Sequence, residues 1–288
     1  MIKNILDVRV RLSYGTALER LLFEKVRDIY IFFIYFNQNL KNRLEYKEDF
    51  IFTVVTGAVL QLTNFMFLWV LFSKIPRIDG WSFWEIVFLF SMLFLSEGFV
   101  SFFFEGIWGM TNIINTGELD RMLLRPLSPL LQIASSSFGP HGLGNMFLGV
   151  YLLILAILNT DFIANASNLF FIIVFIVSAV IIRTSIIVVA NCSGFWIKSS
   201  RNSFNIMMHA ISEFGKYPLN FFNFKIQALI TFIVPYAFIS YYPALFIFRK
   251  SEDIWFYPII TPIIAVVCML SAISIFIFSL RKYESSGH

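Results

Sequence analysis

Long apolar runs dominate this sequence and leave few ways for it to fold. Charged residues make up only 14% of the chain, against about 25% in soluble domains. About 20 apolar residues in a helix cross the hydrocarbon core of a membrane, whereas the strands of a transmembrane barrel alternate apolar and polar residues. The sequence therefore predicts an all-α polytopic membrane protein, with spans at residues 51–72, 83–107, 143–158, 168–195 and 256–280.

The position of one further span is open, because residues 202–222 are mildly apolar and residues 224–248 strongly so. In one interpretation residues 224–248 cross the membrane and residues 202–222 form a cytoplasmic amphipathic segment. In the other, residues 203–218 cross weakly and residues 224–248 form a re-entrant hairpin on the far side. Either interpretation gives six spans. The first stretch contains the ionisable residues His209, Glu213 and Lys216. The second contains the prolines Pro235 and Pro243.

Residues 1–49 form a separate N-terminal segment before the membrane domain, which we place at residues 50–288. Apolar residues recur in this segment at steps of three and four, with charged residues between them. This spacing predicts an amphipathic helix in the plane of the membrane interface; the alternative is a helix packed on the protein itself. The apolar positions are Leu18, Leu22, Val26, Ile29, Phe33, Phe36, Leu40 and Leu44.

Basic residues gather on one side of the predicted topology. They are most frequent in the N-terminal segment, in the loop between the second and third spans, after the fourth span and in the C-terminal tail. Cytoplasmic loops carry the excess of Lys and Arg. We therefore expect both termini and this loop to lie on the cytoplasmic side of the plasma (inner) membrane.

The loop between the second and third spans reads GELDRMLLRPLSP, from Gly117 to Pro129. Its charged residues would be costly in hydrocarbon, so it lies outside the bilayer core. A short amphipathic helix fits the spacing, because Leu119, Met122 and Leu123 share one face. Pro126 ends that helix, since the residue before a proline disfavours helical geometry. The alternative is an ordinary solvated loop.

The sequence contains no pattern of an ATP-binding loop or of a catalytic nucleophile elbow, and its three histidines do not form a metal-binding motif. The remaining candidates for function are ionisable residues within the membrane domain. Glu97 and Arg183 are candidates for an ion pair, and His209 and Glu213 are four residues apart on one helical face. The full set is Glu97, Glu105, Arg183, His209 and Glu213.

The block GELDRMLLRPLSPLLQ resembles the signature of ABC transporter permeases of the type-2 exporter class. It is similar to a branch of small six-span permeases with a G-x-L-D-x-x-L-x-R-P-x-x-P loop. Further similar segments are LEYKEDF, FGKYPL, IVPYAFISYYPA and the closing Y-x-S-S-G. The resemblance extends from about Phe36 onward and is most specific in the central loop and in the proline-containing region before the last span.

The resemblance implies a six-span permease whose central loop is a cytoplasmic coupling helix between spans 2 and 3. It favours the second interpretation of the fifth span, with a re-entrant extracellular hairpin that turns at Pro235 and Pro243 before span 6. The residues that it assigns to contact with an ATPase are Gly117, Glu118, Leu119, Asp120, Arg121, Leu124, Arg125 and Pro126.

The resemblance also implies partners. They are a dimer of P-loop ATPase subunits, which would bind ATP and Mg²⁺, a second permease of the same or a different sequence, and membrane lipid. No nucleic acid, no cofactor and no catalytic or metal site is expected on this chain, which would form half of an export pathway and would not itself be an enzyme. The competing class is an ATP-independent transporter or channel that uses Glu97, Arg183 and Glu213, although the two halves show no convincing repeat of the kind that such transporters often contain.

Overall fold

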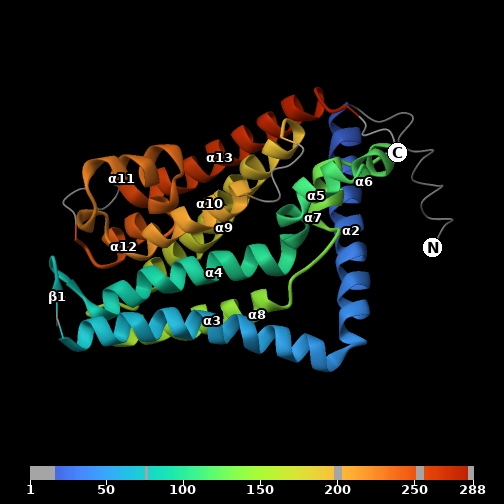
Figure 1. The fold of residues 1–288 in the computed structure, drawn as a ribbon. Helices are drawn as coiled ribbons and strands as arrows, with labels where there is room; N and C mark the ends of the chain where they lie inside the picture. The colour runs from blue at the N-terminus through green and yellow to red at the C-terminus, as the bar shows by residue number, and fades with distance from the viewer. Residues whose placement is uncertain (1–16, 75–76, 198–202, 251–255, 285–288) are drawn as a thin grey trace.

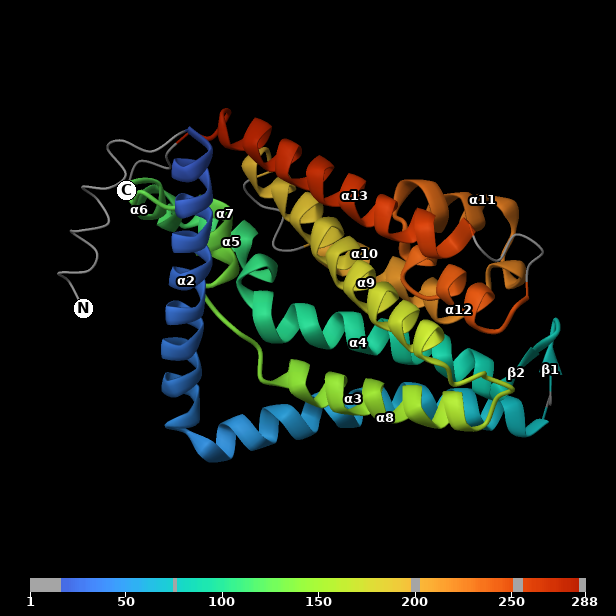
Figure 2. The same ribbon diagram turned by 180° about the vertical axis from the view of Figure 1, so that it is seen from behind.

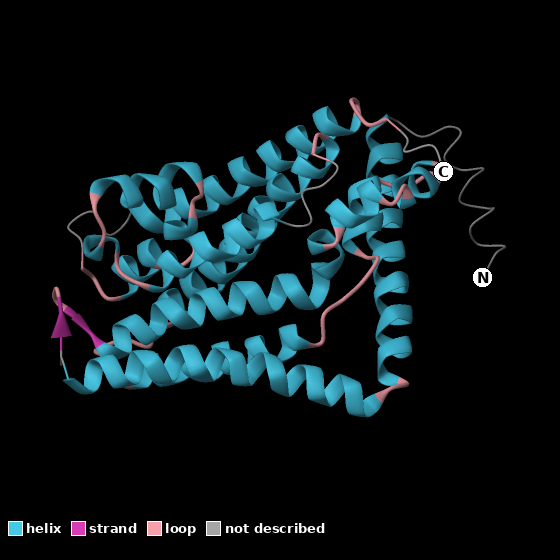
Figure 3. Ribbon diagram, viewed as in Figure 1, coloured by secondary structure: helices cyan, strands magenta, loops and turns pink. Residues whose placement is uncertain are grey.

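The computed structural model describes residues 17–74, 77–197, 203–250 and 256–284, without the side chains of residues 17–26 and 29. The described chain is almost entirely helical (Figure 3). Five of its helices are long and apolar enough to cross a membrane, and they lie side by side in one bundle (Figure 1). They are α3 (Lys47–Lys74), α4 (Phe83–Trp108), α8 (His141–Leu158), α9 (Ala166–Cys192) and α13 (Tyr257–Leu280).

These five helices coincide with the five apolar runs, which confirms the predicted class of polytopic α-helical membrane protein. Helix α4 is the central element, because most of its length is buried by its neighbours. Its contact with α8 depends on glycine: a Cβ atom on Gly142 would lie 2.6 Å from both the Gly98 carbonyl oxygen and the Phe102 amide nitrogen. Small residues at such positions allow two helices in a membrane to approach closely.

The second span is not a straight helix up to its predicted end, and further short helices follow it. Helix α4 is kinked at Phe104, whose φ of −130° and ψ of 27° are not helical. Three short helices follow it: α5 (Met110–Asn115), α6 (Glu118–Leu123) and α7 (Pro129–Ala134). Gly117 joins α5 to α6 with a φ of 74°, a conformation that favours glycine. The central loop is therefore a compact helical layer at one end of the bundle.

Helix α2 (Ala17–Leu44) crosses this end of the bundle at a steep angle to the long helices (Figures 1 and 2). Its aromatic residues pack on the end of α4 and on the segment between α7 and α8, since the Phe36 ring centroid lies 5.3 Å from that of Phe103 in α4 and 5.7 Å from that of Phe138 in that segment. The Asn39 amide donates hydrogen bonds to the backbone oxygens of Ser135 (2.9 Å) and Ser136 (3.3 Å). The helix is thus held against the protein along one face.

The packed face differs from the predicted apolar stripe. Phe36 and Leu40 are half-buried as expected, but Phe33 and Leu44 are exposed. The reason is that α2 turns Asp28, Phe32, Tyr35 and Asn39 toward the protein as well, so the contact includes polar residues. Leu18, Leu22, Val26 and Ile29 lie outside the described side chains. A second apolar strip remains exposed at Tyr30, Phe33 and Ile34.

The region after α9 is not one straight span. Helix α10 (Ser203–Ser212) has ten residues, and the 3-10 turn η2 (Glu213–Lys216) adds four, which together are shorter than a typical membrane span. The apolar run that follows is bent by 75° between Phe224–Ile233 and Tyr236–Ile247. Pro235 lies at this bend and lacks the N–H that a continuous helix needs. Residues 224–248 are therefore not one continuous helix, and a bend of this size occurs both in a broken span and in a re-entrant loop, so both interpretations of this region stay open.

The bent segment consists of η3 (Leu219–Phe221), α11 (Phe224–Ala228), the π-helical turn η4 (Leu229–Ile233), η5 (Tyr236–Phe238) and α12 (Tyr241–Ile247). It packs back on η2, where the Ser240 hydroxyl donates a 2.5 Å hydrogen bond to the Gly215 carbonyl oxygen. The described helices thus give five spans, or six if the bent pair counts as one.

The end of the bundle opposite α2 is closed by a small hairpin of β1 (Arg77–Ile78) and β2 (Trp81–Ser82) (Figure 2). The strands are antiparallel, with Ile78 opposite Trp81. Ser82 begins α4 through a capping box with Glu85, which satisfies backbone N–H groups at the helix start. Glu85 also pairs with Lys250 at 3.0 Å, which ties the bent segment to the start of α4.

Candidate functional site: a coupling surface and a buried charge cluster

Helix α6 is anchored by one side and exposed on the other. The Leu119 side chain is completely buried and belongs to a hydrophobic cluster with Ile107, Met110 and Phe276. Leu124, which directly follows α6, is 87% exposed. Leu124 and its exposed neighbour Leu123 form a contiguous apolar patch beside charged residues, and apolar patches with a polar rim mark interaction sites. The predicted amphipathic helix is present, but its buried face contains Leu119 and half-buried Met122, while Leu123 is 41% exposed.

The exposed surface of α6 also contains charged residues. Glu118 Oε1 lies 3.6 Å from Arg121 Nη2, and both side chains are exposed. Glu118, Arg121, Leu123 and Leu124 together form what we call the α6 outer face. An exposed ion pair of this kind contributes little to stability, so these residues are free to contact another protein.

Other residues of the predicted coupling set contact the rest of the chain. Arg125 Nη1 lies 3.5 Å from the Tyr35 hydroxyl, and Arg27 donates a 3.1 Å hydrogen bond to the Pro126 carbonyl oxygen. Asp120 is half-buried and lies near Tyr283; burial and the Asp120 carboxylate raise the pKa of that phenol to about 12. Helix α2 and the end of the chain thus support the loop.

Sequence reasoning missed Gln132, which holds the loop in shape. Its buried amide donates hydrogen bonds to the Met122 carbonyl oxygen (2.9 Å) and the Leu127 carbonyl oxygen (3.2 Å). These oxygens belong to the end of α6 and to the segment before α7, so one side chain ties the two parts of the loop together. The loop pattern alone gave no sign of this role, since Gln132 reads as one more polar residue in a turn.

A second polar site lies inside the bundle, around the middle of α4. Glu97 Oε2 lies 3.1 Å from Arg183 Nη2, and the Arg183 side chain is only 2% exposed. Arg183 Nη1 also lies 3.4 Å from the Ser96 hydroxyl, and the guanidinium stands 5.9 Å from the Tyr236 ring centroid. The candidate ion pair is thus present, with its cation buried behind its carboxylate.

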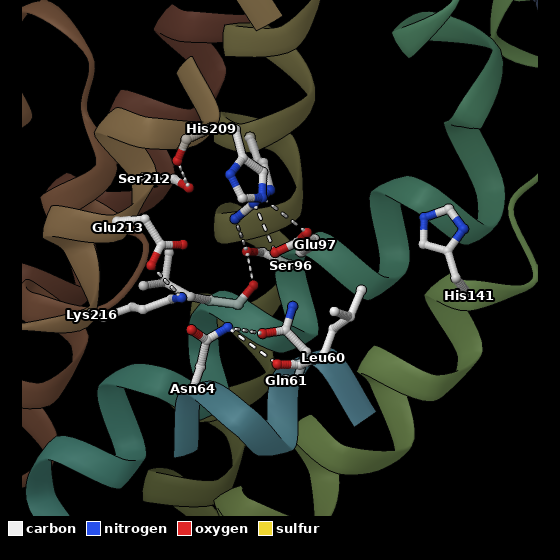
Figure 4. A network of polar contacts seen from close by, with 12 residues as sticks. Leu60, Gln61, Asn64, Ser96, Glu97, His141, His209, Ser212, Glu213 and Lys216 are labelled. Atoms are coloured by element: carbon white, nitrogen blue, oxygen red, sulfur yellow. Dashed lines mark hydrogen bonds and ion pairs between the residues drawn. The ribbon is translucent and has the colours of Figure 1, made fainter. Parts of the chain in front are cut away.

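The His209 imidazole reaches the same carboxylate from α10. Its Nε2 lies 3.7 Å from Glu97 Oε1 (Figure 4). Glu213 does not contact His209 directly, and instead its Oε2 lies 2.6 Å from Lys216 Nζ. The expected contact at a spacing of four residues fails because α10 ends at Ser212 and continues as a tighter 3-10 turn. Lys216, buried over the rings of Phe90 and Phe94, was not among the predicted site residues.

Glu105 belongs to neither pair. It lies directly after the kink of α4, with Oε2 at 4.0 Å from His141 Nε2. The structure thus separates it from Glu97, which lies about two helical turns earlier in α4. Pro235 and Pro243 lie in the bent segment, at its bend and within α12. Among the residues that the structure describes, no group of three or more His, Cys, Asp or Glu is placed to hold a metal ion.

A network of buried amides links the loop layer to α9 and α10. The Asn191 and Asn205 side chains exchange hydrogen bonds of 2.8 and 2.9 Å. Asn191 Oδ1 also accepts a 2.8 Å hydrogen bond from the Thr111 hydroxyl of α5, and Asn205 donates to the Trp108 carbonyl oxygen. A satisfied buried network of this kind fixes one arrangement of the helices that it joins. It therefore connects α5, next to the α6 outer face, with α10, which carries His209.

Comparison with known proteins agrees with this architecture. The sequence model of the ABC-2 family transporter protein matches residues 58–287. The match begins within α3 and includes the other four long helices, the α6 outer face and the buried charge cluster. No curated protein and no solved structure matches the chain. Permeases of this family are transmembrane components that associate with an ABC ATPase subunit. The chain is an integral membrane protein and belongs to the ABC-2 transporter family.

Proposed function

We propose that this chain is the permease subunit of an ABC exporter, that it forms half of the translocation pathway, and that it couples to a separate ATPase through the α6 outer face. The observation that carries the proposal is Leu124, which is 87% exposed beside a helix whose own Leu119 is completely buried. An exposed apolar side chain on a rigid base fits the groove of a partner protein.

The support beneath the α6 outer face explains how a push there could reach the membrane domain. Leu119 packs into the cluster that contains Ile107 of α4 and Phe276 of α13. The Thr111–Asn191–Asn205 network joins the preceding helix α5 to α9 and α10. Because packed side chains transmit displacement with little compression, movement of α6 would move these helices together.

The proposed assembly has further members. A dimer of P-loop ATPase subunits would bind ATP and Mg²⁺, and a second permease, identical or different, would complete the pathway. We further propose that the α6 end of the bundle and both termini face the cytoplasm, and that α2 lies in the interface of the plasma (inner) membrane. In this proposal α10 with η2 is the weak fifth crossing, and a re-entrant extracellular hairpin follows it. The basic residues around α2 and α6 support this orientation.

Capture of the ATPase tests the proposal. Tagged full-length chain is purified from native membranes in mild detergent, and a co-purifying P-loop ATPase is identified by mass spectrometry. The variant L124A should lower the ATPase recovered by about tenfold, since burying a leucine side chain in an interface contributes about 1.5–3 kcal/mol. Reversal of charge at Asp120 together with Arg121 should also weaken capture while the permease remains folded.

The matched control is Y46A, which removes another highly exposed side chain, in the turn between α2 and α3. This variant should recover as much ATPase as the unchanged chain. If no ATPase co-purifies, or if the reconstituted chain alone transports in response to a proton gradient, the ATP-independent alternative through Glu97, Arg183 and Glu213 replaces the proposal. The direct Glu97–Arg183 pair argues against that alternative, because it already neutralises the most buried cation of the cluster.

A further inference from the structure

The charge cluster in the bundle is polarised, with cations inside and carboxylates outside. In the Glu97–Arg183 pair the cation is 2% exposed and the carboxylate 18%. In the Glu213–Lys216 pair the cation is 7% exposed and the carboxylate 45%. The rings of Tyr236, Phe90 and Phe94 cover the two cations, as expected for cation–π contacts. The polar groups that reach the surface are therefore two carboxylates, with the imidazole of His209 beside them.

This surface lies at membrane depth. Glu97 is near the middle of α4 (Phe83–Trp108), and Lys216 stands over Phe90 and Phe94 of the same helix. His209 is 48% exposed and Glu213 is 45% exposed. Ionisable groups at this depth do not face lipid but line an aqueous path or meet a partner group. We call half-buried Glu97 together with exposed His209 and Glu213 the outer polar face.

The outer polar face is also incompletely satisfied. The closest approach of His209 Nε2 to Glu97 Oε1 is 3.7 Å, which is longer than a good hydrogen bond. A visiting cation would meet carboxylate oxygens before it meets Arg183 or Lys216. An anion would meet the same oxygens at closer range than the buried cations that pair with them, and a wholly apolar molecule would cover the polar atoms that point outward without giving them a partner.

We propose that the outer polar face binds the positively charged head of an amphiphilic substrate, whose apolar part lies along the exposed apolar surface of α10 next to His209. Ile206, exposed by 68%, lies three residues before His209 on the same side of α10 and supplies that apolar surface. The proposal rests on the proposed function as a permease, and it assigns the chemical class of the molecule that is carried.

Two hydrophobic ions of the same shape and opposite charge test the proposal. Radiolabelled tetraphenylphosphonium and tetraphenylborate are titrated against the full-length chain in nanodiscs of zwitterionic phosphatidylcholine, and binding to empty nanodiscs is subtracted. Tetraphenylphosphonium should bind saturably, and tetraphenylborate should show no saturable binding over the same range. Saturable binding of both ions with equal affinity, or of neither, would overturn the proposal.

Paired substitutions locate the binding. E213Q with K216M removes a carboxylate and its buried cation together, so no unpaired charge remains. This variant should bind tetraphenylphosphonium at least about tenfold more weakly, equivalent to about 1.4 kcal/mol. E85Q with K250M removes a similar pair at the hairpin end of the bundle and should leave binding unchanged. Unchanged binding in E213Q with K216M contradicts the proposal.

A second pair of variants avoids both buried cations. H209R places a permanent cation beside Glu97 and should weaken tetraphenylphosphonium binding, whereas H209Q should not. Equal binding by the two variants would count against the site. The results are separable from ATPase capture, because capture depends on Leu124 at the end of the bundle. Loss of charge selectivity with normal capture would reject this inference and leave the proposed function in place.

Discussion

At the scale of single residues, glycine decides how closely the central helices approach. A Cβ atom on Gly98 of α4 would lie 2.7 Å from the Met146 amide nitrogen and 2.8 Å from the Gly142 carbonyl oxygen, both in α8. Backbone atoms cannot move aside as a flexible side chain can, so G98A must push the two helices apart. We expect G98A to destabilise the protein by about 1–3 kcal/mol, seen as a lower unfolding temperature in detergent.

The control for that prediction is G109A, at the C-terminal end of the same helix, five residues after the kink. There a Cβ atom would meet only the Gly106 carbonyl oxygen at 3.6 Å, and the φ of −84° suits any residue. The two variants add the same methyl group, so a loss of stability confined to G98A shows close helix packing. Equal stability of both would mean that α4 and α8 are not in tight contact.

Also at this scale, the ion pair between Glu97 and Arg183 shows what sequence reasoning could find. Both residues stood out because ionisable side chains in apolar runs need partners. Lys216 was not predicted as a site residue, since the mildly apolar stretch around it gave no reason to expect a buried lysine. Removing one member of the Glu97–Arg183 pair leaves a buried charge without its partner, which costs about 3–5 kcal/mol.

A double-mutant cycle checks this expectation. We expect E97Q and R183M each to lower the unfolding temperature strongly, and the combined variant to lower it by less than the sum of the two. The reason is that the second substitution removes the charge that the first leaves uncompensated. Strictly additive losses would show that the two side chains do not interact in the folded protein.

At the scale of elements, helix periodicity predicted where helices lie but not which face packs. The N-terminal stripe contained Phe33 and Phe36 in one face, yet Phe36 packs on α4 while Phe33 is exposed. A helix between protein and membrane has two apolar surroundings, so apolar spacing alone cannot separate them. Similarly, α10 and the bent segment contain the polar residues and prolines that left the position of the fifth span open in the sequence.

The attachment of α2 gives a prediction for this element. Asn39 donates hydrogen bonds to the Ser135 and Ser136 carbonyl oxygens, at the end of α7, whereas the neighbouring Gln38 is exposed. We expect N39A to weaken the contact by about 1 kcal/mol and to speed hydrogen exchange in α2 and α7 by about fivefold. Q38A should leave the exchange unchanged, and equal protection in both variants would mean that α2 is held by its aromatic contacts alone.

At the scale of the whole molecule, the apolar runs were sufficient to predict a polytopic bundle, because a long apolar helix has few alternatives to spanning a membrane. The loop layer was only partly predictable. Its helix α6 follows from local spacing, but its rigidity depends on Gln132 and on the Asn191–Asn205 network. Those contacts join segments far apart in the sequence, and a local pattern contains no information about them.

The orientation of the molecule is the property on which coupling depends. The α6 outer face and the loop between α8 and α9 lie at opposite ends of the bundle (Figure 2), with Leu124 in the first and Asp161 in the second both exposed. In a background without Cys192 and Cys268, we expect D161C to react with a membrane-impermeant maleimide in intact cells. L124C should react only after the membrane is permeabilised. The inverse labelling would place Leu124 outside, where no ATP-driven subunit could reach it, and the coupling proposal would then be wrong.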